Sequence, residues 1–366
     1  MNASNQIRLS LPRADFELSV DLLLPAQGIT AIYGASGSGK TSLLRAVAGL
    51  ERAKHSLIRI AGQTWQDDSA AVFVPTWQRS LGYVFQEASL LTHLDVRGNL
   101  EFGLRRTQSM GADSPAQAQQ ILNNAVALMG IGHLLQRKVL QLSGGERQRV
   151  AICRAVATQP SVLLMDEPLA SLGQEHKTEI LPWLARLRDE LQIPMLYVTH
   201  SADEVARLAD HLVVLEHGQV KASGGVASVL SQVVNPVVVG EDAGALLSGQ
   251  VAATEQQWHL ARVDFAGGSV WLRDAGLTIG TPVRIRILAR DVSLSLVQPE
   301  HTSIQNHIAC VVQSIAADAH PSQALLSLKC GDSVLLARLT QRAVHALGLQ
   351  LGTQVWAQVK SVALIE

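Results

Sequence analysis

Residues 29–41 of the chain read ITAIYGASGSGKT, and this stretch decides the fold. Residues 29–33 form a short apolar run, which is typical of a strand buried inside a parallel sheet. Residues 34–41 then match the pattern G-x-x-x-x-G-K-[ST] at every fixed position. A helix is expected from about Thr41 to Gly49. The sequence therefore predicts a strand, a glycine-rich loop and a helix in succession.

This loop is expected to bind the phosphates of a nucleotide. Its glycines let the backbone approach a phosphate closely, and its N–H groups together with the helix N-terminus attract negative charge. Lys40 would reach the β- and γ-phosphates, and the Thr41 hydroxyl would ligate magnesium. A chance glycine-rich turn is the alternative, but the flanking strand and helix favour a nucleotide site. Its candidate residues are Gly34, Ala35, Ser36, Gly37, Ser38, Gly39, Lys40, Thr41 and Ser42.

Residues 162–167, VLLMDE, place two carboxylates at the end of another apolar run. We expect Asp166 to hold magnesium through water and Glu167 to polarise the attacking water. Two acids at the end of a strand also occur in ordinary turns. The phosphate loop earlier in the chain favours the catalytic interpretation.

Residues 142–150, LSGGERQRV, open a helix and predict a second phosphate receptor. Ser143 would cap this helix, while Gly144 and Gly145 leave backbone N–H groups exposed. Because the first receptor is complete by itself, the second would contact a nucleotide bound to another copy of the domain. An ordinary capped helix is the alternative, but it would require only the serine.

Together these motifs resemble the ATP-binding-cassette (ABC) ATPases, the motor subunits of ABC transporters, over about residues 5–230. The motifs YVFQ (residues 83–86) and YVTH (residues 197–200) add to the resemblance. It implies that Gln86 touches magnesium and the permease side, and that His200 contacts the γ-phosphate. The expected catalytic residues are thus Glu167, His200 and Gln86, and the expected metal ligands are Thr41, Gln86 and Asp166.

The chain departs from the family pattern after Glu167. The family usually carries an aspartate in the turn that crosses the dimer, where this chain has Gly173. This removes a charge that helps to couple the two ATP sites, and it bears on the rate and cooperativity of hydrolysis. For stacking on adenine, Phe16 is the best placed aromatic residue, and a core phenylalanine is the alternative.

The order of the patterns predicts the fold class. Loosely alternating residues 7–20 indicate antiparallel strands, residues 96–140 turn helical, and apolar strands alternate with helices up to about residue 200. We therefore expect an α/β, doubly wound ABC-type P-loop ATPase domain with a helical subdomain over residues 1–233.

After about Leu230, short strands separated by Gly, Asp and Pro dominate, which predicts a small all-β, OB-like barrel. A linker is expected around Asn235 and Pro236, and residues 234–290 would contain it and the start of the β-rich region. We expect residues 291–364 to form a barrel domain that folds by itself. The expected strands are 283–288, 292–296, 309–315, 324–328, 334–339 and 355–359.

This second half resembles the molybdate-binding Mop module through TSIQN (residues 302–306) and AQVKSVAL (residues 357–364). Hydroxyl, N–H and ammonium donors suit a tetrahedral dianion. The expected oxyanion-binding residues are Ser303, Asn306, Lys360 and Ser361. Gln305 replaces a residue that is often basic, so weaker affinity is expected. A barrel that serves only in dimerisation and regulation is the alternative.

Nearly end to end, the chain thus resembles the ATPase subunits of molybdate importers. The resemblance implies ATP and Mg²⁺ as cofactors, molybdate as a regulatory ligand, and a homodimer docked on integral membrane permease subunits. A periplasmic or extracellular molybdate-binding protein would act with it indirectly. The chain would be a peripheral protein on the cytoplasmic face of the cell inner membrane, hydrolysing ATP to ADP and phosphate.

Composition agrees with this prediction. The 366 residues include 30 Lys and Arg and 31 Asp and Glu, for a net charge of −1, so no overall basic field exists to hold nucleic acid. Other interpretations remain open: an importer ATPase for another oxyanion such as sulfate or tungstate, a soluble ABC ATPase of DNA repair or translation, and a non-transport molybdate-sensing ABC protein.

Overall fold

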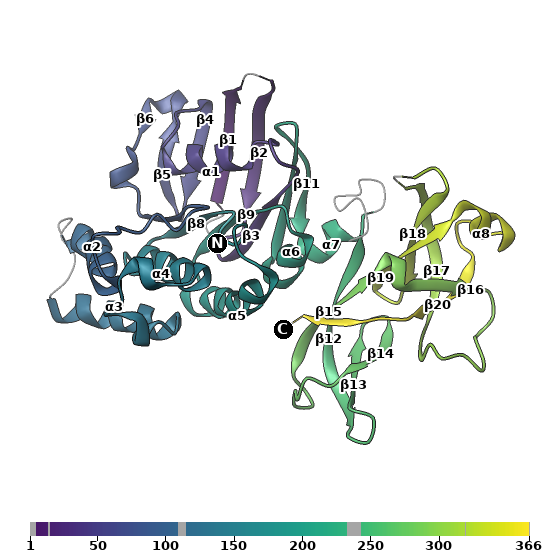
Figure 1. Cartoon of the computed structure of the whole chain (residues 1–366). Helices are drawn as coiled ribbons and strands as arrows, with labels where there is room; N and C mark the ends of the chain where they lie inside the picture. Colours follow the sequence, from purple (N-terminus) through teal and green to yellow (C-terminus); the bar gives the residue numbers. More distant parts are fainter. Residues whose placement is uncertain (1–4, 14, 109–114, 233–242, 319, 366) are drawn as a thin grey trace. The chain divides into compact units, whose positions relative to one another are not determined.

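The computed structural model describes residues 5–13, 15–108, 115–232, 243–318 and 320–365. The chain divides into two compact units, one ending at Ser223 and one beginning at Gly224 (Figure 1). The linker expected around Asn235 and Pro236 lies outside the described residues. Each unit is therefore considered by itself.

In the first unit, the described strands form one sheet in the order β6-β5-β4-β1-β2-β11-β10-β3-β9-β8-β7. Strands β10, β3, β9, β8 and β7 pair with one another in parallel, whereas β1 pairs antiparallel with both β2 and β4. The strands span Asn5–Pro12 (β1), Glu17–Leu24 (β2), Gly28–Tyr33 (β3), Lys54–Ile60 (β4), Gln63–Asp67 (β5), Val72–Phe73 (β6), Leu81–Val84 (β7), Val162–Asp166 (β8), Pro194–Thr199 (β9), His211–Glu216 (β10) and Gln219–Gly225 (β11).

Burial along the strands follows the sequence pattern. Strands β8 and β9 are buried at every position, as a continuous apolar run inside a parallel sheet requires. Strand β2 instead alternates exposed and buried residues, so one face packs on the core and the other meets water. The predicted antiparallel strands and parallel strands are thus confirmed.

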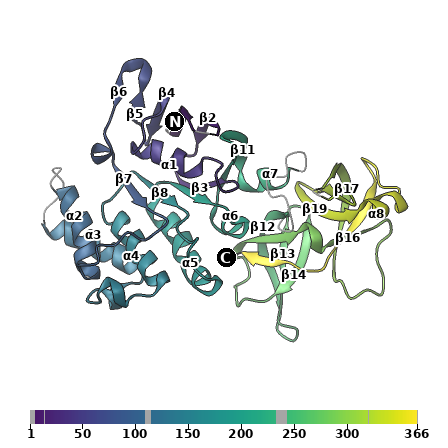
Figure 2. The same ribbon diagram turned by 45° about the horizontal axis from the view of Figure 1, so that its top comes forward.

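The helices cover the parallel part of the sheet and gather beyond β7, where α2, α3 and α4 lie together (Figures 1 and 2). The stretch expected to be helical over 96–140 contains α2, α3 and two short 3₁₀ turns, Gly132–Leu134 and Val139–Gln141. The helices span Lys40–Ala48 (α1), Val96–Gln108 (α2), Pro115–Leu128 (α3), Gly144–Val156 (α4), Gln174–Leu191 (α5) and Ala202–Leu208 (α6).

The second unit consists mainly of two antiparallel sheets of described strands, in the orders β14-β13-β12-β15-β21 and β16-β20-β17-β18-β19. Two short helices accompany them, α7 (Val226–Leu230) and α8 (Gln341–Ala346). The strands span Gly244–Glu255 (β12), Leu260–Phe265 (β13), Gly268–Arg273 (β14), Pro282–Leu288 (β15), Val292–Ser295 (β16), Asn306–Ala317 (β17), Gln323–Cys330 (β18), Ser333–Thr340 (β19), Gln354–Val359 (β20) and Ala363–Ile365 (β21).

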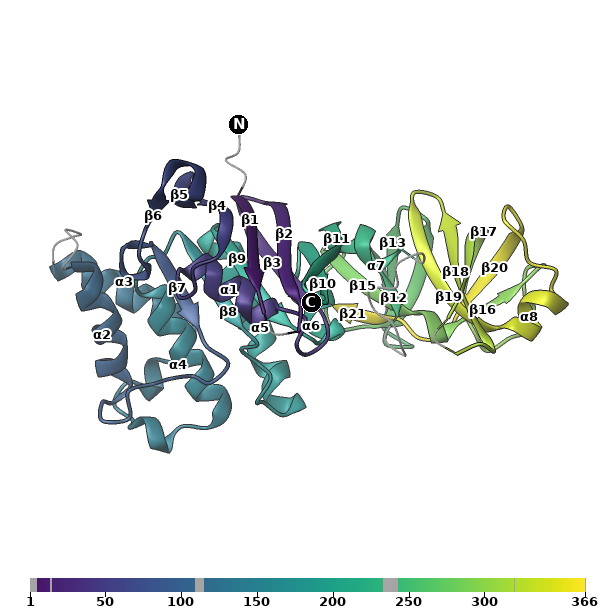
Figure 3. The ribbon, with the colours of Figure 1, turned by 90° about the horizontal axis from the view of Figure 1, so that it is seen from above.

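The six strands expected here are present, but residues 291–364 do not form a self-contained barrel. The last strand, β21, pairs with β15, which joins Leu364 to Ile285 (Figure 3). One hydrophobic core also takes side chains from both sheets, including Val263 and Ile287 of the first and Leu326 and Ala357 of the second. Residues 244–288 are therefore part of the folded β unit.

No helix in the part of the chain that the structure describes is long and apolar enough to cross a membrane.

Candidate active site

The predicted site residues of the first unit gather at one edge of its sheet. The glycine-rich loop follows β3, Asp166 ends β8, His200 follows β9, and Gln86 lies two residues beyond β7. These four strands are neighbours in the sheet order β3-β9-β8-β7 and run parallel, so their carboxyl ends lie at the same edge. This is the edge at which open α/β sheets bind ligands.

The glycine-rich loop is folded around the ammonium group of Lys40. Its Nζ donates to the carbonyl oxygens of Gly34 and Ala35, each at 2.9 Å. The residue is only 4% exposed, and burial lowers the pKa of Lys40, an effect that the nearby carboxylate of Glu167 opposes. The lysine is thus fixed inside the loop that is expected to hold phosphate.

Two glycines of the loop are required by its geometry. A Cβ on Gly34 would lie 2.2 Å from the carbonyl oxygen of Leu215 on β10, so no larger residue fits there. Gly39 has a φ of 102°, a left-handed conformation that L side chains rarely adopt. Directly before α1, this turn aims the loop amides and the first turn of the helix at the same space.

Asp166 and Thr41 lie in direct contact. The Thr41 hydroxyl donates to one oxygen of the Asp166 carboxylate at 2.8 Å, and the Tyr83 hydroxyl donates to the other at 3.3 Å. Burial raises the pKa of Asp166 and, together with the Asp166 charge, that of Tyr83. Hydroxyl and carboxylate oxygens are the donors that Mg²⁺ prefers, so this pair fits a magnesium site.

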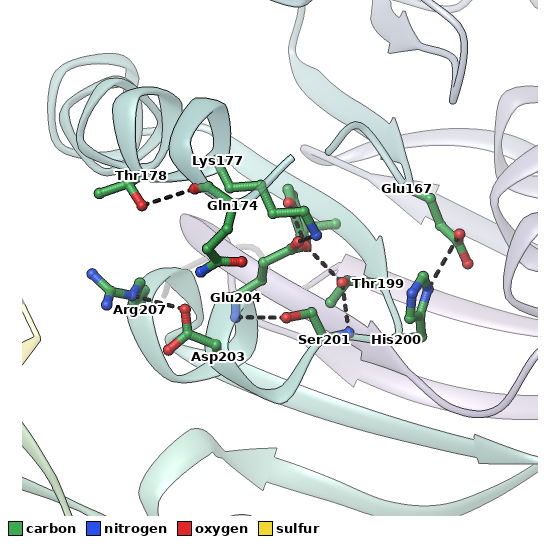
Figure 4. Close-up of polar contacts among 11 residues, drawn as sticks. Glu167, Gln174, Lys177, Thr178, Thr199, His200, Ser201, Asp203, Glu204 and Arg207 are labelled. Atoms are coloured by element: carbon green, nitrogen blue, oxygen red, sulfur yellow. Dashed lines mark hydrogen bonds and ion pairs between the residues drawn. The ribbon is translucent and has the colours of Figure 1, made fainter. Parts of the chain in front are cut away.

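Glu167 stands between two nitrogen-bearing side chains. Its carboxylate lies 3.8 Å from Lys40 Nζ and 3.3 Å from His200 Nδ1, the latter contact being drawn in Figure 4. Its backbone has a φ of 43°, which is uncommon for a residue with a side chain. A carboxylate held in this way can act as a general base toward a water molecule.

A cavity of about 420 Å³ is lined by Lys40, Thr41, Gln86 and Glu167, whereas Asp166 and His200 are not among its lining residues. Phe16, the residue predicted to stack on adenine, also lines it, and its ring lies beside Gly39. The described lining residues are Arg13, Asp15, Phe16, Ser36, Gly37, Gly39, Lys40, Thr41, Ser42, Gln86 and Glu167. The side-chain oxygen of Ser38, another predicted residue, is buried nearby without a hydrogen-bond partner.

The segment that carries Gln86 is fixed by the helix that begins at the LSGG motif. Arg154 of α4 donates to the carbonyl oxygens of Ala88 and Ser89, at 3.5 and 3.0 Å. The buried Asn99 of α2 bonds both the N–H and the carbonyl of Leu91. The sequence pattern did not single out these two residues.

The predicted second receptor does not line the cavity of its own chain. Ser143 accepts a hydrogen bond from the Glu146 N–H at 3.2 Å, and the Glu146 carboxylate accepts one from the Ser143 N–H at 2.7 Å. This reciprocal cap fixes the start of α4, where Gly144 and Gly145 lie. Among the described residues other than its chain neighbours, none has an atom within 4 Å of a Cβ added to Gly173, which precedes α5.

The oxyanion residues of the second unit meet at a separate pocket of about 620 Å³. Ser303, Asn306, Lys360 and Ser361 all line it, and so does Arg273 of β14, a cation that the sequence analysis missed. The Asn306 side chain, however, is bound on both sides to the backbone of Trp271, at 2.7 and 3.0 Å. Asn306 thus joins β17 to β14 through its side-chain oxygen and one of its two amide N–H groups.

Two further features escaped the sequence analysis because their residues lie far apart in the chain. Tyr83 belongs to the quoted YVFQ motif, yet only the pairing of β7 with β8 brings it to Asp166. Arg13 lines the cavity and bonds Ser42 at 3.1 Å across 29 residues. No local spacing could have indicated either contact.

The sheet, the lysine-centred loop and the carboxylates at its edge define an ATP-binding cassette of the ABC transporter class. The ABC transporter family matches residues 18–170, and the TOBE domain family matches residues 302–365. The fold is also that of cbiO1 from Clostridium perfringens, part of the ABC transporter complex cbiONQ. That structure gives a TM-score of 0.54 at 24% identity, over 63% of this chain and 92% of that one.

Curated relatives extend the match to nearly the whole chain. A molybdenum import ATP-binding protein ModC from Methylococcus capsulatus is 54% identical over 96% of both chains. ModC from Thiobacillus denitrificans is 53% identical over 99% of this chain and 98% of its own. ModC 1 from Azotobacter vinelandii is 48% identical over 98% of each. The chain belongs to the ModC family of ABC transporter ATPases.

Proposed function

We propose that this chain is the ATP-hydrolysing subunit of an ABC importer for molybdate. The observation that carries the proposal is the cavity in which Lys40, Thr41 and Glu167 converge, with Asp166 bonded to Thr41. The relatives that match nearly the whole chain are named as molybdenum import proteins, and we infer the transported molybdate from those names.

The chemistry follows from these residues. Lys40 and the loop amides would bind the phosphates. Thr41 and Gln86 would ligate magnesium, Asp166 would hold it through water, and the bound ion would neutralise phosphate charge. Glu167 would accept a proton from the attacking water. His200 would hold the carboxylate oxygen of Glu167 that lies away from Lys40, and it would contact the γ-phosphate. We assign these roles to the ATPase domain, residues 1–233.

Two copies would act head to tail. The start of α4 presents Ser143, Gly144 and Gly145 without lining the cavity of its own chain, which supports contact with a nucleotide held by the partner. Each ATP would then be covered by one phosphate loop and one LSGG motif. Gly173 leaves the turn before α5 without the usual carboxylate, so we infer weaker coupling between the two sites.

The helical region beside Gln86 supports docking on membrane permease subunits. Phe85, Phe102 and Leu140 are large apolar side chains that are exposed there, Leu140 to 78%. A contiguous exposed apolar patch is a mark of partner contact, and we propose that these side chains belong to one. We propose that the chain acts at the cytoplasmic face of the cell inner membrane, with a molybdate-binding protein acting on the far side.

We assign the Mop-like region, residues 291–364, a regulatory role with molybdate as ligand. Lys360 and Arg273 supply charge and Ser303 and Ser361 supply hydroxyls around one pocket, which suits a tetrahedral dianion. Bound anion would slow the ATPase when molybdate is plentiful. Asn306, whose side chain bonds β14, would shape the pocket and could offer its second amide N–H to the anion.

The ATPase proposal is tested on the full chain with nucleotide-binding and phosphate-release assays. Wild type should bind and hydrolyse Mg-ATP, and Lys40→Ala should weaken ATP binding by about 10- to 100-fold, the value of a lost charged hydrogen bond. Lys54→Ala is a matched control, since Lys54 is exposed on β4. Unchanged affinity in Lys40→Ala would contradict the assignment.

The anion proposal is tested by calorimetry of the full chain with molybdate, tungstate and sulfate. Lys360→Gln should remove the molybdate heat, while Lys329→Gln, an exposed lysine on β18 that lies outside the pocket, should leave it intact. No heat in wild type, or equal affinity for sulfate, would leave this region a dimerisation and regulatory element that binds no molybdate.

A further inference from the structure

A buried carboxylate on α6 collects three hydrogen bonds beside the His200 loop. Glu204 is 3% exposed. One of its oxygens accepts from the Thr199 hydroxyl at 2.7 Å, and the other accepts from Lys177 Nζ at 2.9 Å (Figure 4). The first oxygen also accepts from the Tyr197 hydroxyl at 2.9 Å. Charge-assisted bonds of this kind are among the strongest in proteins when buried.

These bonds hold the residues on both sides of His200, the residue that contacts Glu167. Thr199 directly precedes His200, and its hydroxyl also accepts the N–H of Ser201 at 3.0 Å. Ser201 in turn caps α6 by accepting the Glu204 N–H at 3.3 Å. The residues on both sides of His200 are therefore tied, directly or through α6, to the same glutamate.

The bond from Lys177 reaches a different element. Lys177 lies in the first turn of α5, the helix that begins just after Gly173. Glu204 thus ties the His200 loop to the helix that follows the turn leading from Glu167. The His200 loop and, through Lys177, the start of α5 are therefore anchored at one buried group.

We propose that Glu204 is a positioning residue for ATP hydrolysis, which holds His200 against Glu167 and fixes the start of α5 relative to both. This inference rests on the proposed ATPase function. Glu204 itself does not line the nucleotide cavity, so its effect reaches the reaction through His200. Small displacements of a reacting group are costly, and about 1 Å can lower the rate by about 100-fold.

The test variant is Glu204→Gln, which keeps size and shape but removes the charge that pairs with Lys177. In the full chain we expect kcat for ATP hydrolysis to fall by about tenfold or more, while the Kd for ATP stays within about twofold. Asp203→Asn is the matched control, since Asp203 neighbours Glu204 on α6 but pairs with Arg207 at 3.0 Å. It should retain wild-type kcat.

A double-mutant cycle with His200→Ala separates positioning from general damage to the fold. If Glu204 acts through His200, Glu204→Gln should lower kcat little further in the His200→Ala background. An equal loss in both backgrounds, or wild-type kcat in Glu204→Gln, would overturn the inference. Where Glu204→Gln does not fold, Thr199→Val, which removes one of the three donors, takes its place in the cycle.

The same assays keep the two proposals apart. A wild-type chain that binds no ATP and releases no phosphate would overturn the proposed function and this inference with it. Hydrolysis by wild type that is unaffected by Glu204→Gln and by Thr199→Val would overturn this inference alone.

Discussion

At the scale of single residues, we expect Glu167 to be required for ATP hydrolysis but not for ATP binding. Its carboxylate lies between Lys40 and His200, while the phosphate loop is formed without it. We predict that Glu167→Gln keeps the affinity for ATP and lowers kcat by about 100-fold or more, the loss expected for a general base. Equilibrium binding and single-turnover hydrolysis measure the two quantities, and turnover at the wild-type rate would contradict this role.

Asp166 gives the protein a pH dependence with a defined sign. Burial raises the pKa of Asp166 in the folded chain, so the folded state binds this proton more tightly than the unfolded state. Without nucleotide and magnesium, its ionisation therefore costs folding free energy as the pH rises past the unfolded value of about 3.9.

Asp166→Asn should consequently raise the melting temperature of the ligand-free chain, by more at pH 7 than at pH 4. The same substitution should abolish the further stabilisation that Mg-ATP gives to wild type. Thermal unfolding at the two pH values, with and without Mg-ATP, measures both effects. An Asn variant less stable than wild type at pH 7 would show that the bonds from Thr41 and Tyr83 outweigh the burial cost.

The residues found from sequence are those that belong to contiguous motifs. Lys40, Asp166 and Glu167 each follow an apolar strand and could be assigned a place at the sheet edge before the structure was known. Glu204 and Arg154 could not, because their partners lie on other elements and ordinary helical residues surround them. Contacts made by tertiary packing leave no local signal.

At the scale of elements, the start of α4 carries the predicted contact between copies. We expect Ser143→Arg to leave ATP binding intact and to block ATP-dependent dimerisation, since the long cation would fill the space required by the γ-phosphate of the partner. Light scattering of a Glu167→Gln chain with ATP measures the dimer.

Ser143→Ala is the matched control for this change. It also loses the cap with Glu146, at a cost of about 1 kcal/mol, but adds no bulk. It should therefore still dimerise. An ATP-dependent dimer in Ser143→Arg would remove the basis for a second phosphate receptor.

Strands and helices could be predicted where apolar residues followed a single clear pattern. They could not be predicted where strands were short or polar. The buried strands β8 and β9 were clear from their apolar runs. Strand β5, QTWQD, has mostly polar letters, and its pairing with β4 includes a bulge. The sequence does not predict strands β12 to β14, because residues 234–290 are expected to contain a linker and only the start of the β-rich region. The shared core requires these strands.

At the scale of the whole molecule, the β unit is larger than the Mop-like motifs that revealed it. Its core joins residues 244–288 to residues 292–365. We predict that a fragment of residues 291–366 shows no cooperative thermal transition, whereas a fragment of residues 224–366 does, since only the second keeps both sheets. Circular dichroism on heating measures this, and cooperative melting of the shorter fragment would contradict the shared core.

The central claim is that this cassette powers molybdate import, and vesicle uptake tests it most directly. The chain is reconstituted with its permease and binding protein, with ATP on the side of the cassette, and molybdate accumulation is followed over time. We expect ATP-dependent uptake with wild type and none with Lys40→Ala or Glu167→Gln. Uptake that survives either substitution, or accumulation of sulfate in place of molybdate, would contradict the account.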